Sequence, residues 1–120
     1  MPYEIRSDSH RNLLYVRLDG YLTDMEAASA ADKVIAEVDR LSPGFDAITD
    51  IRTFKPGSPR VAEELMRAQR AYKVKAIRRL IRVVGESVVA KMQFQRTGSE
   101  VGLEVAYVSS LKEAEALLGR

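Results

Sequence analysis

Cysteine is absent from this chain of 120 residues, and histidine occurs only once, at His10. Without cysteine the chain can form no disulfide and can use no thiolate, and a single histidine is too little for a typical zinc site. We therefore expect neither a bound metal ion nor any other cofactor.

Long apolar runs are also absent. No run approaches the roughly 18 residues that a membrane-spanning helix needs, and residues 1–6 lack the apolar core of a secretion signal. Hydrophobic residues nevertheless make up 46% of the chain, which is enough to build one core. The sequence predicts a cytoplasmic protein that folds as a single domain over residues 1–120.

A large excess of charge of one sign is also absent, because the net charge is only +2. This value does not predict a nucleic-acid partner. The distribution is less even. Residues 24–39 are mainly acidic, whereas residues 67–82 contain no acid. The two segments could be complementary solvated faces, or the second could be a basic docking surface for an acidic partner or anionic lipid headgroups. The basic surface would consist of Arg67, Arg70, Lys73, Lys75, Arg78 and Arg79.

Strands and helices alternate along the sequence. Alternating or compact apolar patterns predict strands at residues 3–6, 13–18, 45–51, 80–84 and 103–107, the first two joined as a hairpin. Helices are expected from the capping box Thr23–Glu26, from Pro59, from residues 85–87 to about Thr97, and from a second capping box at Ser110. This order predicts an α/β fold in which most strands are parallel.

The strand pattern also predicts how the layers are arranged. Apolar and polar residues alternate in the strands, so we expect all helices on one face of the sheet and a half-solvated second face that carries Arg17, Arg82, Asp46 and Glu104. In the first helix, the expected buried positions are Met25, Ala28, Ala31, Ile35 and Val38.

Three segments together resemble the SpoIIAA-like family of the STAS (sulfate transporter and anti-sigma factor antagonist) domain superfamily. They are LDGYLT (18–23), GFD (44–46) through DIR (50–52) with FKPGSP (54–59), and RVVGES (82–87) with AKMQ (90–93). The resemblance implies a mixed five-stranded sheet, with an N-terminal hairpin followed by βαβαβα and helices mainly on one face. It also implies a protein partner and a regulatory role like that of an anti-sigma factor antagonist.

The resemblance draws attention to Ser58. In phosphorylatable members of the superfamily, an acid that ends a strand precedes a loop whose serine accepts phosphate. Asp50 matches that acid and Ser58 matches the helix start, whereas PGSP (56–59) replaces the rest of the motif. From the residues alone, Ser58 is either a helix N-cap before an N1 proline, or a phospho-acceptor or anion site flanked by Arg52, Lys55 and Arg60.

The carboxyl ends of parallel strands build the binding crevice of an α/β sheet. We therefore expect residues 50–58 to lie beside residues 85–87, which could also be a plain strand-to-helix turn. The candidate anion- or partner-binding loop consists of Asp50, Arg52, Lys55, Gly57, Arg60, Gly85, Ser87 and Lys91.

No set of residues has the pattern of a catalytic site. Asp46 and Asp50 share a strand face, but strand spacing separates them by roughly 13 Å, which is too far for a carboxylate pair. An enzyme is therefore the third and least favoured interpretation, and two other functions stay open. One is a non-enzymatic interaction module with a phosphorylatable or anion-binding Ser58 loop, and the other is a protein that binds a small apolar ligand or lipid, or a membrane surface. The sequence does not predict the oligomeric state.

Overall fold

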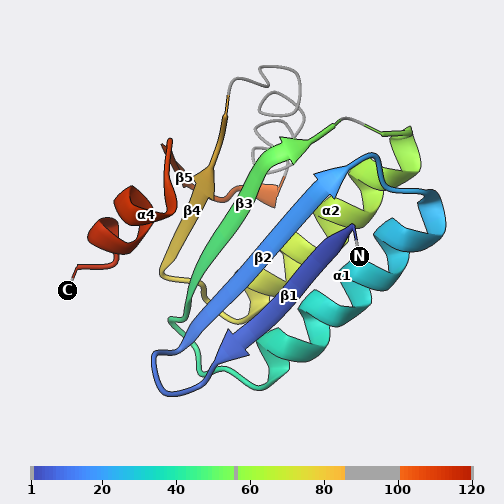
Figure 1. The fold of residues 1–120 in the computed structure, drawn as a ribbon. Coiled ribbons are helices and arrows are strands. Elements are labelled where there is room, and N and C mark those ends of the chain that lie inside the picture. Colours follow the sequence, from blue (N-terminus) through green and yellow to red (C-terminus); the bar gives the residue numbers. More distant parts are fainter. Residues whose placement is uncertain (1, 56, 86–100, 120) are drawn as a thin grey trace.

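The computed structural model describes residues 2–55, 57–85 and 101–119. Its elements follow the predicted order (Figure 1), and they are β1 (Tyr3–Asp8), β2 (Leu13–Gly20), α1 (Asp24–Asp39), β3 (Asp46–Phe54), α2 (Pro59–Val74), β4 (Arg79–Val83), β5 (Val105–Val108) and α4 (Leu111–Leu117). The helix expected from residues 85–87 to Thr97 falls outside the described residues, as do Ser87 and Lys91.

The sheet has five strands in the order β1-β2-β3-β4-β5. The hairpin strands β1 and β2 are antiparallel, and each later neighbour is parallel. In the hairpin turn, the Asp8 carboxylate accepts the amides of His10 and Arg11, and Asn12 adopts a φ of 52°. The predicted mixed five-stranded α/β fold is thus confirmed.

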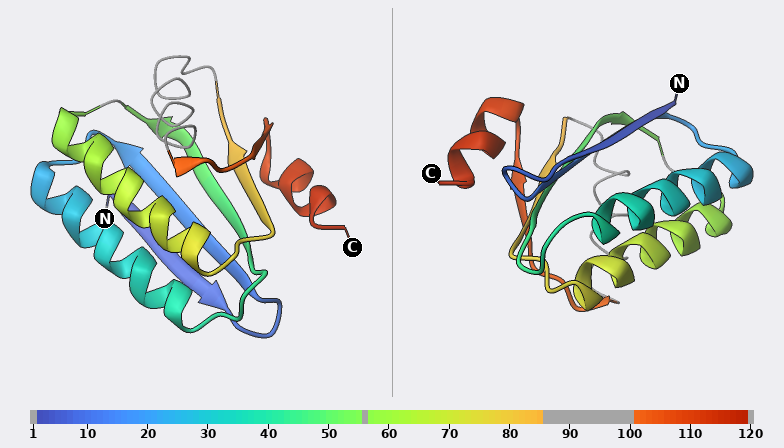
Figure 2. Two further views of the ribbon diagram at one scale, coloured as in Figure 1. Left: turned by 180° about the vertical axis from the view of Figure 1, so that it is seen from behind. Right: turned by 90° about the horizontal axis from the view of Figure 1, so that it is seen from below.

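The helices do not all lie on one face. Helices α1 and α2 cover one face, but α4 lies on the opposite side of the sheet (Figure 2). The prediction of helices mainly on one face is right, and the stricter prediction of one face only is wrong for α4. The reason is that β3, β4 and β5 place a second apolar set opposite the main core, and α4 packs on it. This second cluster comprises Leu13, Ile48, Ile81, Val83, Val108, Ala114 and Leu118.

The side chains of β4 face the opposite sides of the sheet from those that the sequence pattern predicted. Its register aligns Leu80 with Ala47 and Arg82 with Thr49, so that Leu80 and Arg82 face α1 and α2 rather than solvent. Arg82 is only 1% exposed. Both alternating sets of β4 contain apolar residues, and therefore periodicity alone could not decide which set faces the main core.

The start of α1 is as predicted. The Thr23 hydroxyl accepts the Glu26 amide at 3.1 Å, and the Glu26 carboxylate accepts the Thr23 amide at 2.9 Å. The predicted buried stripe is right for Ala31 and Val38 but wrong for Met25, which is 82% exposed. The side of α1 that faces the sheet is instead rich in alanine, and its buried apolar residues are Ala27, Ala30, Ala31, Val34 and Val38.

The end of α2 is a Schellman turn. The Ile77 amide donates to the Tyr72 carbonyl at 3.0 Å, and the Ala76 amide donates to the Lys73 carbonyl at 3.0 Å. Ala76 has a φ of 56°, the left-handed conformation in which glycine is usual. Ala76 is exposed, and the turn at this residue ends the helix.

Candidate functional site

Ser58 lies where α2 begins, but its hydroxyl does not cap the helix. The backbone is extended at φ −68° and ψ 166°, and Pro59 follows at the first helical position. The hydroxyl instead donates a 2.5 Å hydrogen bond to the Asp24 carboxylate in the first turn of α1. The side chain of Ser58 thus joins the starts of two helices that are 34 positions apart in the chain.

Gly57 lets the chain pass close to the core just before Ser58. A Cβ atom on Gly57 would lie 2.9 Å from Cγ2 of Val61 and 3.6 Å from the Leu22 carbonyl oxygen. Val61 is fully buried, so it has little room to move. The segment that precedes α2 is consequently held against the core, with Ser58 on the surface.

The cations expected around Ser58 are largely engaged. Arg52 contacts Asp50 through two hydrogen bonds of 3.0 and 2.7 Å, and Arg60 contacts Glu64 at 3.0 Å. The hydrogen bonds that Arg52 donates to Asp50 raise the pKa of Arg52. Lys55 is exposed, and its side chain has no ion pair among the described residues. Arg60 remains 57% exposed, so both it and Lys55 are accessible to an anion.

Gly85 lies next to the carboxyl end of β3. A Cβ atom on Gly85 would be 3.3 Å from the Arg52 carbonyl oxygen. The structure therefore brings Gly85 together with Arg52 and Asp50. Ser58 contacts Asp24 instead of this group, and the other expected members, Ser87 and Lys91, are not described.

Two exposed apolar side chains flank Asp24 in the sequence. Tyr21 is 69% exposed and Met25 is 82% exposed, although residues of both types are usually partly buried and are common in protein interfaces. The sequence analysis missed this pair because it placed Met25 in the core. A signal was available, since Tyr21 precedes the helix cap and Met25 lies in the polar first turn.

The predicted basic surface is mostly used inside the molecule. Arg67 binds Asp32 and Glu64 and donates to the Ala28 carbonyl, so it links α2 to α1. The other engaged members bind backbone carbonyls or, in one case, a carboxylate: Lys73 binds Val101, Lys75 binds Asp39 and Arg78 binds Asp46. Within the described part of the chain, only Arg70 and Arg79 of this set have no such partner.

The half-solvated face of the sheet is covered by ion pairs. Arg17 binds Glu4 at 2.6 Å and Asp19 at 2.8 Å, and the Arg6 guanidinium lies 4.3 Å from the centre of the Tyr15 ring. The hydrogen bond that Arg17 donates to Asp19 is the main cause of the raised pKa of Arg17. Oppositely charged groups thus satisfy one another across β1 and β2.

No family model matches the chain, and no curated protein matches its sequence. Several solved structures do match in three dimensions, and two of them show the degree of likeness. The anti-sigma factor antagonist SpoIIAA in its unphosphorylated form superimposes with a TM-score of 0.71 at 14% identity, over 98% of this chain and 99% of that one. The chain has a SpoIIAA-like fold.

The second structure has the same fold and a similar degree of likeness. It is an uncharacterized protein of the DUF3478 family with a SpoIIAA-like fold, from Shewanella loihica PV-4, with a TM-score of 0.72 at 14% identity. The match covers 97% of this chain and 91% of that one. At this identity the likeness establishes the fold.

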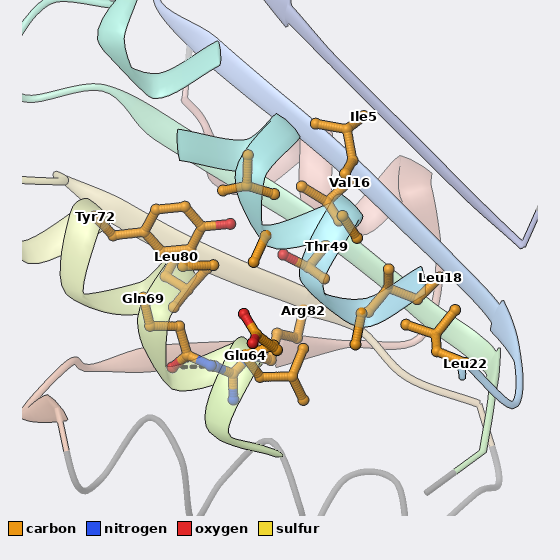
Figure 3. Close-up of a pocket in the computed structure, with 16 residues that line it drawn as sticks. Ile5, Val16, Leu18, Leu22, Thr49, Glu64, Gln69, Tyr72, Leu80 and Arg82 are labelled. Atoms are coloured by element: carbon orange, nitrogen blue, oxygen red, sulfur yellow. Dashed lines mark hydrogen bonds between the residues drawn. The ribbon is translucent and has the colours of Figure 1, made fainter. Parts of the chain in front are cut away.

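In this SpoIIAA-like fold, a small cavity lies between the sheet and helices α1 and α2 (Figure 3). Its volume is about 40 Å³, and most of its lining is apolar. Polar side chains also reach it, including Thr49, Gln69, Tyr72 and Arg82. The cavity is large enough for a few water molecules at most, far below the roughly 300 Å³ or more of a typical ligand pocket.

The buried polar groups around the cavity bind one another. Arg82 donates to the Gln69 side-chain oxygen at 3.2 Å and to the Tyr107 hydroxyl at 3.3 Å. Burial lowers the pKa of Arg82, and burial raises the pKa of Tyr72 to about 12. Both pKa shifts arise because burial disfavours the charged form of a side chain. The polar groups of the cluster therefore serve to hydrogen-bond one buried guanidinium.

The described residues contain no group of three or more histidine, aspartate or glutamate side chains placed to hold a metal ion. None of the helices described is both long enough and apolar enough to cross a membrane.

Proposed function

We propose that this chain is a non-enzymatic STAS-type interaction module that binds a protein partner in the cytoplasm. The proposal takes residues 1–120 as one domain. Its docking surface would consist of the Ser58 loop (Lys55 and residues 57–60) and the adjoining first turn of α1, with Tyr21 and Met25 as apolar contacts. The SpoIIAA-like fold supports the module, because SpoIIAA is an anti-sigma factor antagonist, a protein that acts on another protein.

The observation that carries the proposal is the hydrogen bond from Ser58 to Asp24. An exposed serine hydroxyl at a helix start is free of the capping role and is held instead by a carboxylate. A phosphoryl group on Ser58 would replace the donated proton and would place negative charge beside Asp24. The link between the starts of α1 and α2 would then be lost, while Lys55 and Arg60 are near enough in sequence to bind the phosphate.

Phosphorylation would therefore act as a local switch of the docking surface. The two helix starts would separate by charge repulsion, and a partner that reads both starts would distinguish the two forms. The similar structure is that of SpoIIAA in its unphosphorylated form, which implies that a phosphorylated form also exists and so supports this proposal. The PGSP sequence differs from the phosphorylated motif of that superfamily, so a kinase would have to accept a proline after the serine.

The test combines phosphosite mapping with capture of partners. The full chain is incubated with bacterial lysate and ATP, and phosphate is mapped by mass spectrometry. Partners are then compared for the wild type, Ser58→Ala, Ser58→Asp and the control Ser29→Asp, which adds the same charge at an exposed position of α1. We expect phosphate on Ser58, and we expect Ser58→Asp but not Ser29→Asp to weaken partner binding by about tenfold or more.

The role of Asp24 gives a sharper version of the same test. Asp24→Asn keeps an acceptor for the Ser58 hydroxyl but removes the charge that would repel a phosphate. In this background Ser58→Asp should cost less binding than in the wild type. Absence of phosphate on Ser58, combined with an unchanged set of partners for Ser58→Asp, would contradict the switch.

The alternative is a protein that binds a small apolar ligand, a lipid or a membrane surface. It has less support, because the apolar cavity between the sheet and helices α1 and α2 is small and four of the six residues of the basic surface are engaged. Flotation with neutral and with anionic vesicles tests it, with Arg70→Glu as the charge variant. Equal recovery with both kinds of vesicle is expected; a preference for anionic vesicles that Arg70→Glu removes would favour the alternative.

A further inference from the structure

Helix α4 differs from the other described helices in size and in place. It has 7 residues, whereas α1 and α2 have 16 each, and it lies alone on its side of the sheet among the described elements (Figure 2). An isolated helix of this length is unstable in water, so its contacts with the sheet must hold it. Ala114 and Leu118 are buried in those contacts, whereas Leu117 is 40% exposed.

Grooves flank α4 on two sides. One groove of about 140 Å³ separates it from the β1–β2 hairpin and is lined by Leu111 and Glu115 of the α4 segment together with Leu13, Tyr15 and Ile48, among others. A second groove of about 340 Å³ lies beside Leu117. The helix therefore rests on the sheet along a narrow strip of contact.

One exposed ion pair links α4 to the hairpin turn. Arg11 donates to the two carboxylate oxygens of Glu115 at 2.6 and 3.4 Å. The side chains are 46% and 50% exposed, and ion pairs at that exposure add little stability. The start of the helix is fixed locally, because the Ser110 hydroxyl accepts the Glu113 amide and the Glu113 carboxylate accepts from Ser109.

Beneath α4 the sheet is apolar, unlike the ion-paired surface of β1 and β2. Ile48, Ile81, Val83 and Val108 form this strip, and each is at most 9% exposed with α4 in place. Loss of α4 would expose the strip, and a contiguous apolar surface of this kind favours association.

We propose that α4 is a displaceable cover, which opens while the sheet and helices α1 and α2 stay folded, and that the uncovered strip accepts α4 of a second copy of this chain. The strip selects apolar side chains at positions 111, 114 and 118 of a helix, with a carboxylate at position 115 facing Arg11. The α4 segment of another copy has this pattern by definition. Only Ser109 and Ser110 join β5 to α4, and a short connection of this kind favours exchange between copies over long excursions within one copy.

Hydrogen exchange measured by mass spectrometry on the full chain tests the opening. Amides of α4 should exchange at least a hundredfold faster than those of β2 and β3. Arg11→Glu should speed exchange in α4 by about three- to tenfold without changing β3, and Glu115→Arg in the same chain should restore it. Arg70→Glu, which makes the same charge change on exposed α2, should leave α4 unchanged. Exchange of α4 at the rate of β2 and β3 would overturn the proposal.

The absence of cysteine allows a clean test of the second copy. One population carries Arg11→Cys and another carries Glu115→Cys, and the two are mixed and treated with a short bismaleimide. The control mixture pairs Arg11→Cys with Glu63→Cys, an exposed site on α2. Exchange of α4 predicts at least tenfold more cross-linked heterodimer in the first mixture. Equal yields in the two mixtures would refute exchange between copies, even if α4 opens.

Discussion

Replacing Ala76 by glycine should stabilise the protein, although the same change destabilises most helical positions. Ala76 has a φ of 56° in the turn that ends α2, and its side chain is exposed, so no packing is lost. The left-handed conformation costs an L-residue about 1–2 kcal/mol, whereas the greater freedom of glycine in the unfolded chain costs about 0.5–1 kcal/mol. The net gain for Ala76→Gly is then about 0.5 kcal/mol.

The control is Ala36→Gly. Ala36 is also exposed but lies within α1, where glycine costs about 1 kcal/mol relative to alanine. The two variants should therefore differ by about 1.5 kcal/mol in free energy of unfolding. With a typical urea dependence of about 1–3 kcal/mol per molar, their midpoints should be about 0.5–1.5 M apart.

Urea unfolding followed by far-ultraviolet circular dichroism measures both midpoints. The Ala76→Gly midpoint should lie above that of the wild type and the Ala36→Gly midpoint below it, with equal slopes. If both variants lower the midpoint by similar amounts, the positive φ at residue 76 carries no strain and the reasoning fails.

Three further changes follow from the described contacts. Gly57→Ala should lower stability by about 1 kcal/mol in urea unfolding, because its Cβ would press on buried Val61; an unchanged midpoint would show that this contact relaxes freely. Arg82→Ala should cost about 3 kcal/mol in the same assay, since it leaves a buried gap beside Gln69, and a loss under 1 kcal/mol would contradict that role. Folding lowers the pKa of Glu64, so the stability that its carboxylate contributes is present above the pKa of the unfolded chain and is lost as acid protonates the group. Glu64→Gln should therefore flatten the fall of the urea midpoint between about pH 5 and pH 3. A fall as steep as that of the wild type would count against this role of Glu64.

Local signals predicted the elements of this fold well. The capping box at Thr23 and the hairpin before it depend on neighbouring residues, and the structure has both. The order of strands and helices, together with short connections, then restricts the topology, which is why the mixed sheet could be predicted.

The errors concern contacts between distant segments. Met25 was placed in the core because alanine-rich α1 offers more than one apolar stripe, and only the sheet decides which stripe is buried. Arg82 was placed in solvent because a strand buried on both faces shows no useful alternation. The hydrogen bond between Ser58 and Asp24 could not be predicted, since it depends on how the starts of two helices meet.

The charged surface of β1 has a consequence for how molecules meet. Strand β1 is the outermost strand at one edge of the sheet, where unpaired backbone groups could recruit a strand from a neighbouring molecule. A neighbour docking there would have to desolvate Glu4 and Arg6 beside that edge, both of which are already committed to salt bridges. The charged side chains on this edge therefore oppose the addition of strands from other molecules, and with it the growth of fibrils from this side of the sheet.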